Sequence, residues 1–280
     1  MAELLLETLL LKSAIGLRLL DAWSGQPVAD GLDCALLRKR DGAVLAPTAV
    51  SSGGVQHWPA LRWPWNAADA PPDAPAPAPA PQALAEILVT DRLDRFLPLR
   101  LDWPPAPDQP GGALASATLL SAPQRLAPVG AASIAGLLTD AAGLPAAWAR
   151  VLATDAAGRV TEGSADAAGR LALHLPFPRP ERVAPASPPL PWAPPTAPVT
   201  LRVFHSAAVA TEAMQSRGAG TPPGGAPLAA LWRAQPEVRA LAHIATTDAL
   251  GPLRLEPGRP AVPRTAGLPL NRSELRLLPP

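Results

Sequence analysis

Short runs in which apolar and polar residues alternate recur along the chain and predict β-strands. In residues 15–20, Ile15, Leu17 and Leu19 alternate with glycine or polar residues, which is the period of a half-buried strand. Further runs of this kind follow at residues 33–38, 43–45, 86–90, 96–101, 147–154, 170–175 and 199–204. Because turn-forming residues separate most of these runs, the sequence predicts meanders of short strands.

A repeated tetrapeptide, Asp-Ala-Ala-Gly, separates the strands of the second half. It occurs at Asp140–Gly143, Asp155–Gly158 and Asp166–Gly169. The first-position Asp bonds the turn backbone and the fourth-position Gly tolerates a positive φ, so each copy suits a type I turn. The three aspartates are also conceivable calcium ligands, but spacings of 15 and 11 residues do not gather carboxylates as an Asp-x-Asp-x-Asp-Gly loop does. We therefore predict structural turns.

The strand pattern at residues 170–175 separates a core face from a solvent face. Its leucines share one side, whereas Arg170, Ala172 and His174 share the other and are expected to be exposed to solvent. His205 follows the end of the next strand and is also expected to be exposed. The one good helix pattern covers residues 228–235, where Pro236 would end it.

Proline-rich segments divide these patterns into two groups. Ala-Pro repeats at about residues 66–83 favour polyproline II and are interpreted as an insertion within the first group. Another Pro-rich loop, at residues 176–198, is long for a compact domain and indicates an insertion or a contact surface. We place the boundary at about residue 128, which gives a first β-sandwich at residues 1–127 and a second, with a C-terminal extension, at residues 128–280.

The second group of strands resembles a known domain family. The opening Ile134-Ala-Gly, the turn from Asp140 to Pro145 and the closing Asp166-Ala-Ala-Gly-Arg-Leu resemble the carboxypeptidase-regulatory-like domain. Residues 20–28 form a weaker copy of that opening. The resemblance implies a transthyretin-like Greek-key sandwich and indicates fold rather than activity. The expected fold class is therefore all-β: tandem Greek-key, Ig-like or transthyretin-like β-sandwiches with Pro-rich loops and one short C-terminal helix.

The order of several motifs along the whole chain is similar to a further group. The motifs are Asp21–Val28, Asp91–Pro98, Gly136–Trp148 and Arg264–Gly267 with Ser273–Leu275. This order resembles the regulatory-like-domain proteins of extracellular contractile injection systems, which are phage-tail-like particles. The resemblance implies a non-catalytic structural or adaptor component, near a cap or terminus, present in several copies. Its partners would be sheath, tube, cap or baseplate proteins.

Composition and charge narrow the possible partners. The 280 residues include 39 Pro, 21 Gly and 8 Trp but no Tyr, and the formal net charge is +1 with 17% charged residues. A chain with so little net positive charge does not attract the phosphate backbone of nucleic acids, so no nucleic-acid partner is expected. No apolar run reaches the roughly 18 residues of a membrane-spanning helix, and Glu3 and Glu7 stand where a signal peptide would be basic. We expect cytoplasmic synthesis without a signal peptide or membrane insertion, followed by incorporation into a particle.

The residues that usually carry chemistry are scattered. His57, His174, His205 and His243 stand singly, without a metal-ligand spacing, and Cys34 lies in an apolar alternating run typical of a buried structural thiol. No Gly-x-Ser-x-Gly elbow or phosphate-binding loop is present. We therefore predict no catalytic, cofactor-binding or metal residues, no cofactor, and no enzymatic activity.

Tryptophans are the candidate interface residues. Trp58, Trp63 and Trp65 cluster in one stretch, and Trp192 and Trp232 lie in or beside Pro-rich segments. Exposed aromatics anchor protein interfaces or stack on sugars, whereas the structural alternative is that the cluster covers the open end of the first domain. Two other functions remain open: a carbohydrate- or surface-binding β-sandwich module, and an accessory protein for an enzyme.

Overall fold

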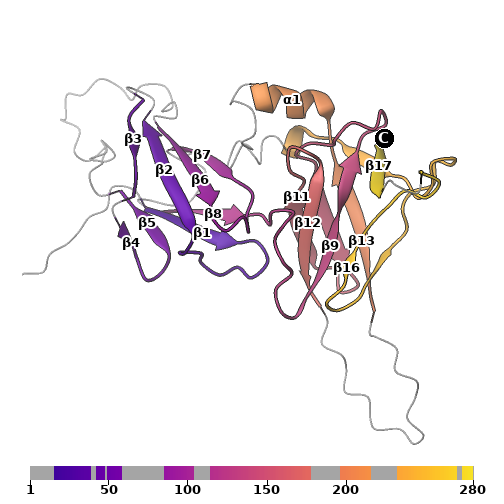
Figure 1. Cartoon of the computed structure of the whole chain (residues 1–280), viewed down its shortest axis with the longest axis horizontal. Helices are drawn as coiled ribbons and strands as arrows, with labels where there is room; N and C mark the ends of the chain where they lie inside the picture. Colours follow the sequence, from indigo (N-terminus) through magenta and orange to yellow (C-terminus); the bar gives the residue numbers. More distant parts are fainter. Residues whose placement is uncertain are drawn as a thin grey trace, which may run out of the picture.

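The computed structural model describes residues 16–38, 42–47, 49–58, 85–103, 114–177, 196–215, 232–269 and 273–279. Strands dominate this part of the chain, which confirms the all-β sandwich prediction. They form two units that lie side by side in Figure 1, the first drawn in indigo to magenta and the second in magenta to yellow. Within the described ranges, no strand is shared between the sheets of the two units.

The first unit is a sandwich of two sheets. Its strands are β1 (Gly16–Asp21), β2 (Leu32–Arg38), β3 (Val44–Leu45), β4 (Ala49–Val50), β5 (Val55–His57), β6 (Ala85–Asp91), β7 (Leu99–Trp103) and β8 (Leu114–Leu119). One sheet has the order β4-β5-β1-β8 and the other β3-β2-β6-β7. The first strand, β1, pairs in parallel with the last, β8, from Gly16 opposite Leu114 to Asp21 opposite Leu119.

The core of the first unit lies between these two sheets. Leu17 and Leu19 of β1 and Ile87 of β6 are fully buried, as strict alternation requires. Cys34 of β2 is also buried here, and burial raises the pKa of its thiol to about 12. The prediction of a buried structural thiol is thus confirmed.

The second unit is one curled sheet. Its strands are β9 (Ala131–Thr139), β10 (Arg150–Asp155), β11 (Val160–Ser164), β12 (Arg170–Pro176), β13 (Ala197–Phe204), β14 (Glu237–Ala240), β15 (Leu253–Leu255), β16 (Pro260–Ala261) and β17 (Glu274–Leu278). The main path is β11-β10-β13-β14-β17-β9-β12. Its two ends come together, because a Cβ added at Gly163 of β11 would lie only 2.7 Å from Leu173 Cδ1 of β12. As in the first unit, the first and last strands pair in parallel, with β9 beside β17.

Each Asp-Ala-Ala-Gly tetrapeptide forms the predicted turn. The carboxylate of Asp155 accepts the backbone N–H groups of Ala157 and Arg159, both at 2.9 Å, and Gly158 takes a φ of +78°. Asp166 and Arg170 repeat this arrangement, including the ion pair between the two side chains. In these turns the aspartates are bound by backbone donors, as the turn interpretation predicts.

The first unit contains the same turn in a form that the tetrapeptide search misses. Asp91 accepts the backbone N–H of Arg95 at 2.7 Å and pairs with its guanidinium. Asp94, with a φ of +53°, stands where the other turns have glycine. Asp tolerates the left-handed region better than most residues do, so the turn survives the replacement.

The helix content differs from the prediction. The structure places α1 at Ala207–Gln215, directly after β13, where no helix was expected. Ser206 caps it by accepting the N–H of Val209 at 3.4 Å. Of the predicted helix at 228–235, residues 232–234 are helical and Gln235 forms a bend, whereas residues 228–231 lie outside the described residues, as does the Ala-Pro segment at 66–83.

An apolar cluster joins the two units. It contains Leu97, Leu120 and Ala122 from the first unit and its connector, and Trp148 and Ala210 from the second. Trp148 is 2% exposed and holds a positive φ of +57°, a strained conformation for an aromatic residue that surrounding packing must hold in place. The units are therefore docked through a hydrophobic contact rather than only tethered by the chain.

A buried ion pair reinforces the connector between the units. Both guanidinium N–H groups of Arg125 donate to the two carboxylate oxygens of Asp21 at 2.8 Å, and both side chains are about nine-tenths buried. Burial opposes ionisation of Asp21, but Arg125 and the backbone N–H of Trp23 together lower its pKa. Arg125 also stacks 4.6 Å from the centre of the Phe96 ring. The connector is thus fixed to the end of β1.

Candidate protein-binding cleft

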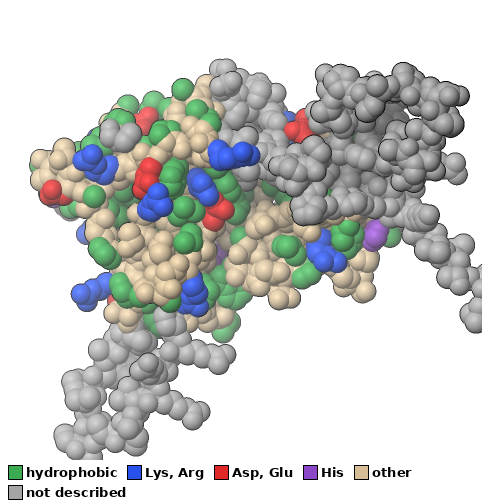
Figure 2. All heavy atoms as spheres, turned by 180° about the vertical axis from the view of Figure 1, so that it is seen from behind, with side chains coloured by type: hydrophobic (Ala, Val, Ile, Leu, Met, Phe, Trp, Pro, Cys, Tyr) green, Lys and Arg blue, Asp and Glu red, His purple; other side chains and the backbone are tan. Residues whose placement is uncertain are grey.

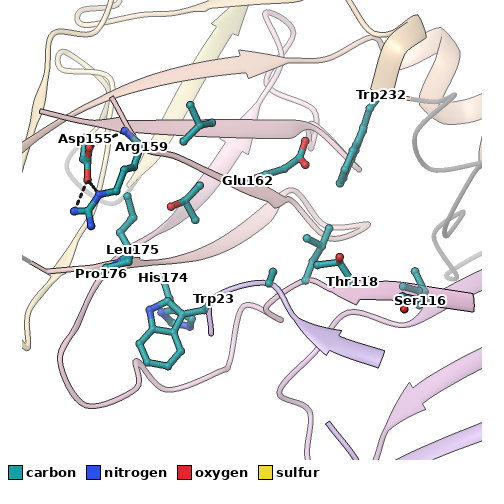
Figure 3. A pocket seen from close by; sticks show the side chains of 16 residues that line it. Trp23, Ser116, Thr118, Asp155, Arg159, Glu162, His174, Leu175, Pro176 and Trp232 are labelled. Carbon is teal, nitrogen blue, oxygen red and sulfur yellow. Dashed lines mark hydrogen bonds and ion pairs between the residues drawn. The ribbon is translucent and has the colours of Figure 1, made fainter. Parts of the chain in front are cut away.

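A cleft of about 600 Å³ lies where the two units meet. Its walls come from β8 and the β1 end of the first unit, and from β11, β12 and the helical turn at Trp232 of the second. The lining side chains are Ala22, Trp23, Leu99, Ser116, Ala117, Thr118, Leu120, Asp155, Arg159, Val160, Thr161, Glu162, His174, Leu175, Pro176 and Trp232. Figure 3 shows Trp23 and Trp232 reaching the cleft from the two different units.

Three of the lining side chains carry buried polar nitrogens without a partner. The indole N–H groups of Trp23 and Trp232 and both ring nitrogens of His174 have no hydrogen-bond partner among the described residues. Buried donors of this kind are uncommon, because each one loses the free energy of a hydrogen bond to water. These nitrogens are shielded from solvent, so a ligand in the open cleft does not reach them.

His174 is placed differently from its prediction. It was expected on a solvent face, yet it is 3% exposed and its neighbour Ala172 is buried as well. The reason is tertiary: the first unit and the connector cover the face of β12 that alternation assigns to solvent. Burial, together with the nearby Arg125 guanidinium, lowers the pKa of His174 to about 4, so its ring is neutral at pH 7.

His205 corrects the second histidine prediction. It was expected to be exposed after the end of β13, but it is 7% exposed. Its backbone N–H donates to the carbonyl of Pro236 at 3.0 Å, which draws the strand end under the segment that leads into β14. Burial lowers the pKa of this ring too, while the carboxylate of Asp140 opposes the shift.

The charges that line the cleft are already paired within the chain. Arg159 contacts the Asp155 carboxylate at 2.7 Å, and Glu162 pairs with Arg150 in a very short contact. Apart from His174 and the two tryptophans, the remaining lining groups are hydroxyls, such as those of Ser116 and Thr118 of β8, and apolar side chains. The cleft is therefore polar but offers no net charge to a ligand.

The predicted tryptophans do not form one surface. Trp58 is 2% exposed, lies in the core of the first unit and donates its indole N–H to the carbonyl of Leu45 at 3.1 Å. Its interpretation as an exposed anchor is corrected, because the side chain fills space between the sheets. Trp63, Trp65 and Trp192 lie outside the described residues. Trp232 is half-buried and lines the cleft.

Sequence reasoning missed most of the cleft. Trp23 lies in a turn, and Ser116 and Thr118 belong to an Ala- and Ser-rich strand with no chemical motif. Their significance comes from the docking of the two units, which alternation along one strand does not encode. The only available signal was the tryptophan itself, at the end of the first predicted strand.

The described residues show few other features of a site. Within them, no group of three or more His, Cys, Asp or Glu side chains is arranged to hold a metal ion. No helix in the described ranges is long and apolar enough to cross a membrane. Figure 2 shows Arg side chains interspersed with Asp and Glu over the second unit, rather than gathered into a patch of one sign.

Comparison with known proteins adds no functional assignment. The sequence matches no protein-family model and no curated protein. Among solved structures, the chain is similar to the shaft pilin SpaA of Lactobacillus rhamnosus GG, with 9% identity and a TM-score of 0.23, covering 95% of this chain and 97% of the pilin. It is also similar to a streptococcal ancillary pilin, with 7% identity and a TM-score of 0.20, covering 95% of this chain and 62% of that one.

Proposed function

We propose that this chain is a non-catalytic structural or adaptor protein that acts through protein–protein contacts. The observation that carries the proposal is the fixed docking of its two β units. An apolar cluster around Trp148 and the buried pair of Asp21 with Arg125 hold them together. A rigid pair of β units presents edges and loops at set distances, which is the property that an assembly component needs.

The use of charged residues supports the same proposal. Asp91, Asp155 and Asp166 each hold a turn and pair with the arginine four residues later. Asp21 is held by Arg125 and by the backbone N–H of Trp23 in its own turn. These carboxylates stabilise the turns in which they lie. Turns of fixed shape are what a structural component requires.

The assembly that we propose is a contractile injection, phage-tail-like particle. The support is the order of motifs from Asp21–Val28 to Ser273–Leu275, which resembles components of such particles. The chain would be made in the cytoplasm and incorporated in several copies, near the cap or terminus. Its direct partners would be sheath, tube, cap or baseplate proteins.

Sedimentation of the tagged chain tests this proposal. The lysate of the producing bacterium is separated on a density gradient, and fractions are inspected by electron microscopy and probed for the tag. Co-migration with rod-shaped particles is expected. Tag found only near the top of the gradient, as a free species near 28.8 kDa, would refute membership of a particle.

A carbohydrate-binding module is the second candidate. The observation in its favour is that Trp23 and Trp232 line one cleft together with the hydroxyls of Ser116 and Thr118. A glycan array probed with the full chain, and with Trp23→Ala as control, would detect such binding. Sugar binding that Trp23→Ala abolishes would favour this candidate over the structural one.

A further inference from the structure

The two units meet at a joint made of the apolar cluster around Trp148, the Asp21–Arg125 pair and His174. His174 belongs to β12 of the second unit and is 3% exposed. It lines both the cleft between the units and a second cavity of about 950 Å³ beside the connector. Its two ring nitrogens are buried, and no described residue forms a hydrogen bond with either of them. The closed joint therefore holds this ring without the acceptors that both N–H groups of an imidazolium need.

The first unit and its connector direct two charged groups at His174. The guanidinium of Arg125 disfavours a charge on the ring, and the carboxylate of Asp21 favours one. Both oxygens of Asp21 already accept hydrogen bonds from Arg125 at 2.8 Å, so the carboxylate is largely neutralised. Arg125 also donates to the hydroxyl of Ser121 at 3.0 Å and stacks on the ring of Phe96, so it is not free to turn away. A proton on His174 would thus face a fixed cation.

The second unit supplies no counter-ion for this ring among its described residues. On the neighbouring strand β9, Ser133 lies opposite His174 in the antiparallel ladder. Asp155 and Glu162, which line the cleft, are each paired with an arginine. Arg125 is the one charged side chain among the described residues that line the second cavity. An imidazolium in the closed joint would therefore lose its hydration without gaining a partner, which is strongly unfavourable.

The connector offers a hinge about which the two units could separate. Residues 126–130 lie between Arg125, which is fixed to the first unit, and the start of β9. The side chains of Leu126 and Val129 are exposed, and Gly130 has a φ of +82° with no other group near its Cα. A few loop residues of this kind can absorb the change in backbone angles that a hinge motion requires. Because no strand pairing among the described residues joins the units, rotation here would open neither sheet system.

We propose that the joint is an acid-sensitive switch, in which a proton on His174 is accommodated by separation of the two units while each unit stays folded. At neutral pH the closed joint keeps the units at a fixed distance, and in acid the open joint lets them rotate about residues 126–130. The joint would open in this way whether or not the chain belongs to a particle, so failure of either proposal leaves the other standing.

The expected size of the response follows from the two states of the ring. Burial and Arg125 lower the pKa of His174 to about 4 in the closed joint, whereas in the open joint the ring regains its ordinary pKa of 6.5. The open form therefore binds the proton first and gains population as the pH falls from 6.5 toward 4. The ratio of open to closed molecules should rise about 30-fold between pH 8 and pH 5. The pKa of Asp21 lies below its usual range, so its pair with Arg125 persists at pH 5.

Thiol labelling of the full-length chain measures this ratio. Ala122→Cys places a thiol in the apolar cluster of the joint, at a position that is 3% exposed. The reagent is dithiodipyridine, which reacts with thiols in acid as well as at neutral pH. Each labelling rate is divided by the rate of the same chain unfolded in urea at the same pH. Ala210→Cys, in α1 on the other side of the cluster, repeats the measurement from the second unit.

Two buried thiols report unfolding instead of opening. The native Cys34 lies in the core of the first unit, and Ala153→Cys, at a fully buried position, reports on the core of the second. Peptide mapping distinguishes the thiols of one chain. Both core thiols should be labelled far more slowly than the thiol at the joint at either pH. Labelling of either core thiol as fast as the joint would mean that a unit unfolds, which overturns the proposal.

Matched glutamine variants identify the group that takes up the proton. His174→Gln keeps a neutral polar side chain in the joint, and His205→Gln does the same at a buried histidine that lines neither cavity. Between pH 8 and pH 5 we expect labelling at the joint to rise about 30-fold in the parent and with His205→Gln, but less than about threefold with His174→Gln. No rise in the parent, an equal rise with His174→Gln, or loss of the rise with His205→Gln would each overturn the proposal.

Discussion

Acidification should destabilise this protein through the buried His174. The pKa of this ring is 6.5 in an unfolded chain and about 4 in the folded one, where burial and Arg125 disfavour the charged form. The unfolded chain therefore binds the proton first. The stabilising contribution is complete above pH 6.5 and is lost as the pH falls toward 4. The loss is about 2 kcal/mol at pH 5 and about 3 kcal/mol below pH 4.

Urea unfolding followed by tryptophan fluorescence at pH 8 and pH 5 measures this loss. His205 is buried as well, and its lowered pKa contributes in the same direction. Comparison with His174→Gln isolates one ring, because glutamine keeps a neutral polar side chain but does not titrate. We expect the wild type to lose about 2 kcal/mol more than the variant between the two pH values. Equal losses would show that His174 is accessible to protons in the folded state and would refute the reasoning.

Three further changes test the turns and the contact between the units. Gly169→Ala should lower the free energy of unfolding by about 3 kcal/mol, because φ is +75° and the new Cβ would lie 2.5 Å from a carbonyl oxygen. Gly158→Ala, at a φ of +78° but in open space, should lower it by about 1 kcal/mol. Equal values in chemical denaturation would contradict the steric argument. Asp21→Asn should cost about 3 kcal/mol in the same assay by leaving Arg125 buried and unpaired, and a cost below 1 kcal/mol would mean that water reaches the pair. Trp148→Ala should cost about 3–5 kcal/mol and increase the radius of gyration in X-ray scattering, and an unchanged radius would show that other contacts dock the units.

The features that were predictable from sequence are local ones. Alternation along β1 and β6 identifies their buried faces, and the spacing from Asp155 to Gly158 specifies a turn whose hydrogen bonds all lie within five residues. The burial of Cys34 follows from the same alternation. Each of these depends on neighbours in the chain, so one segment carries enough information.

The features that were missed depend on the docking of the two units. Alternation correctly separates the faces of β12, but it does not reveal that the first unit covers the side bearing His174. Trp58 and Trp232 look alike in sequence, yet the first fills a core and the second lines the cleft. The helix α1 was missed because its Ala-rich sequence has no strong apolar stripe.

The parallel pairing of first and last strands has a mechanical consequence. β1 pairs with β8 in the first unit, and β9 with β17 in the second. If the chain is pulled from its ends, the strands of each pair are drawn in opposite directions along their lengths. All hydrogen bonds between them are then loaded together, instead of opening one after another as they do when a hairpin is unzipped. Each unit is thus closed by a shear clamp, and tension transmitted along the chain meets two such clamps in series.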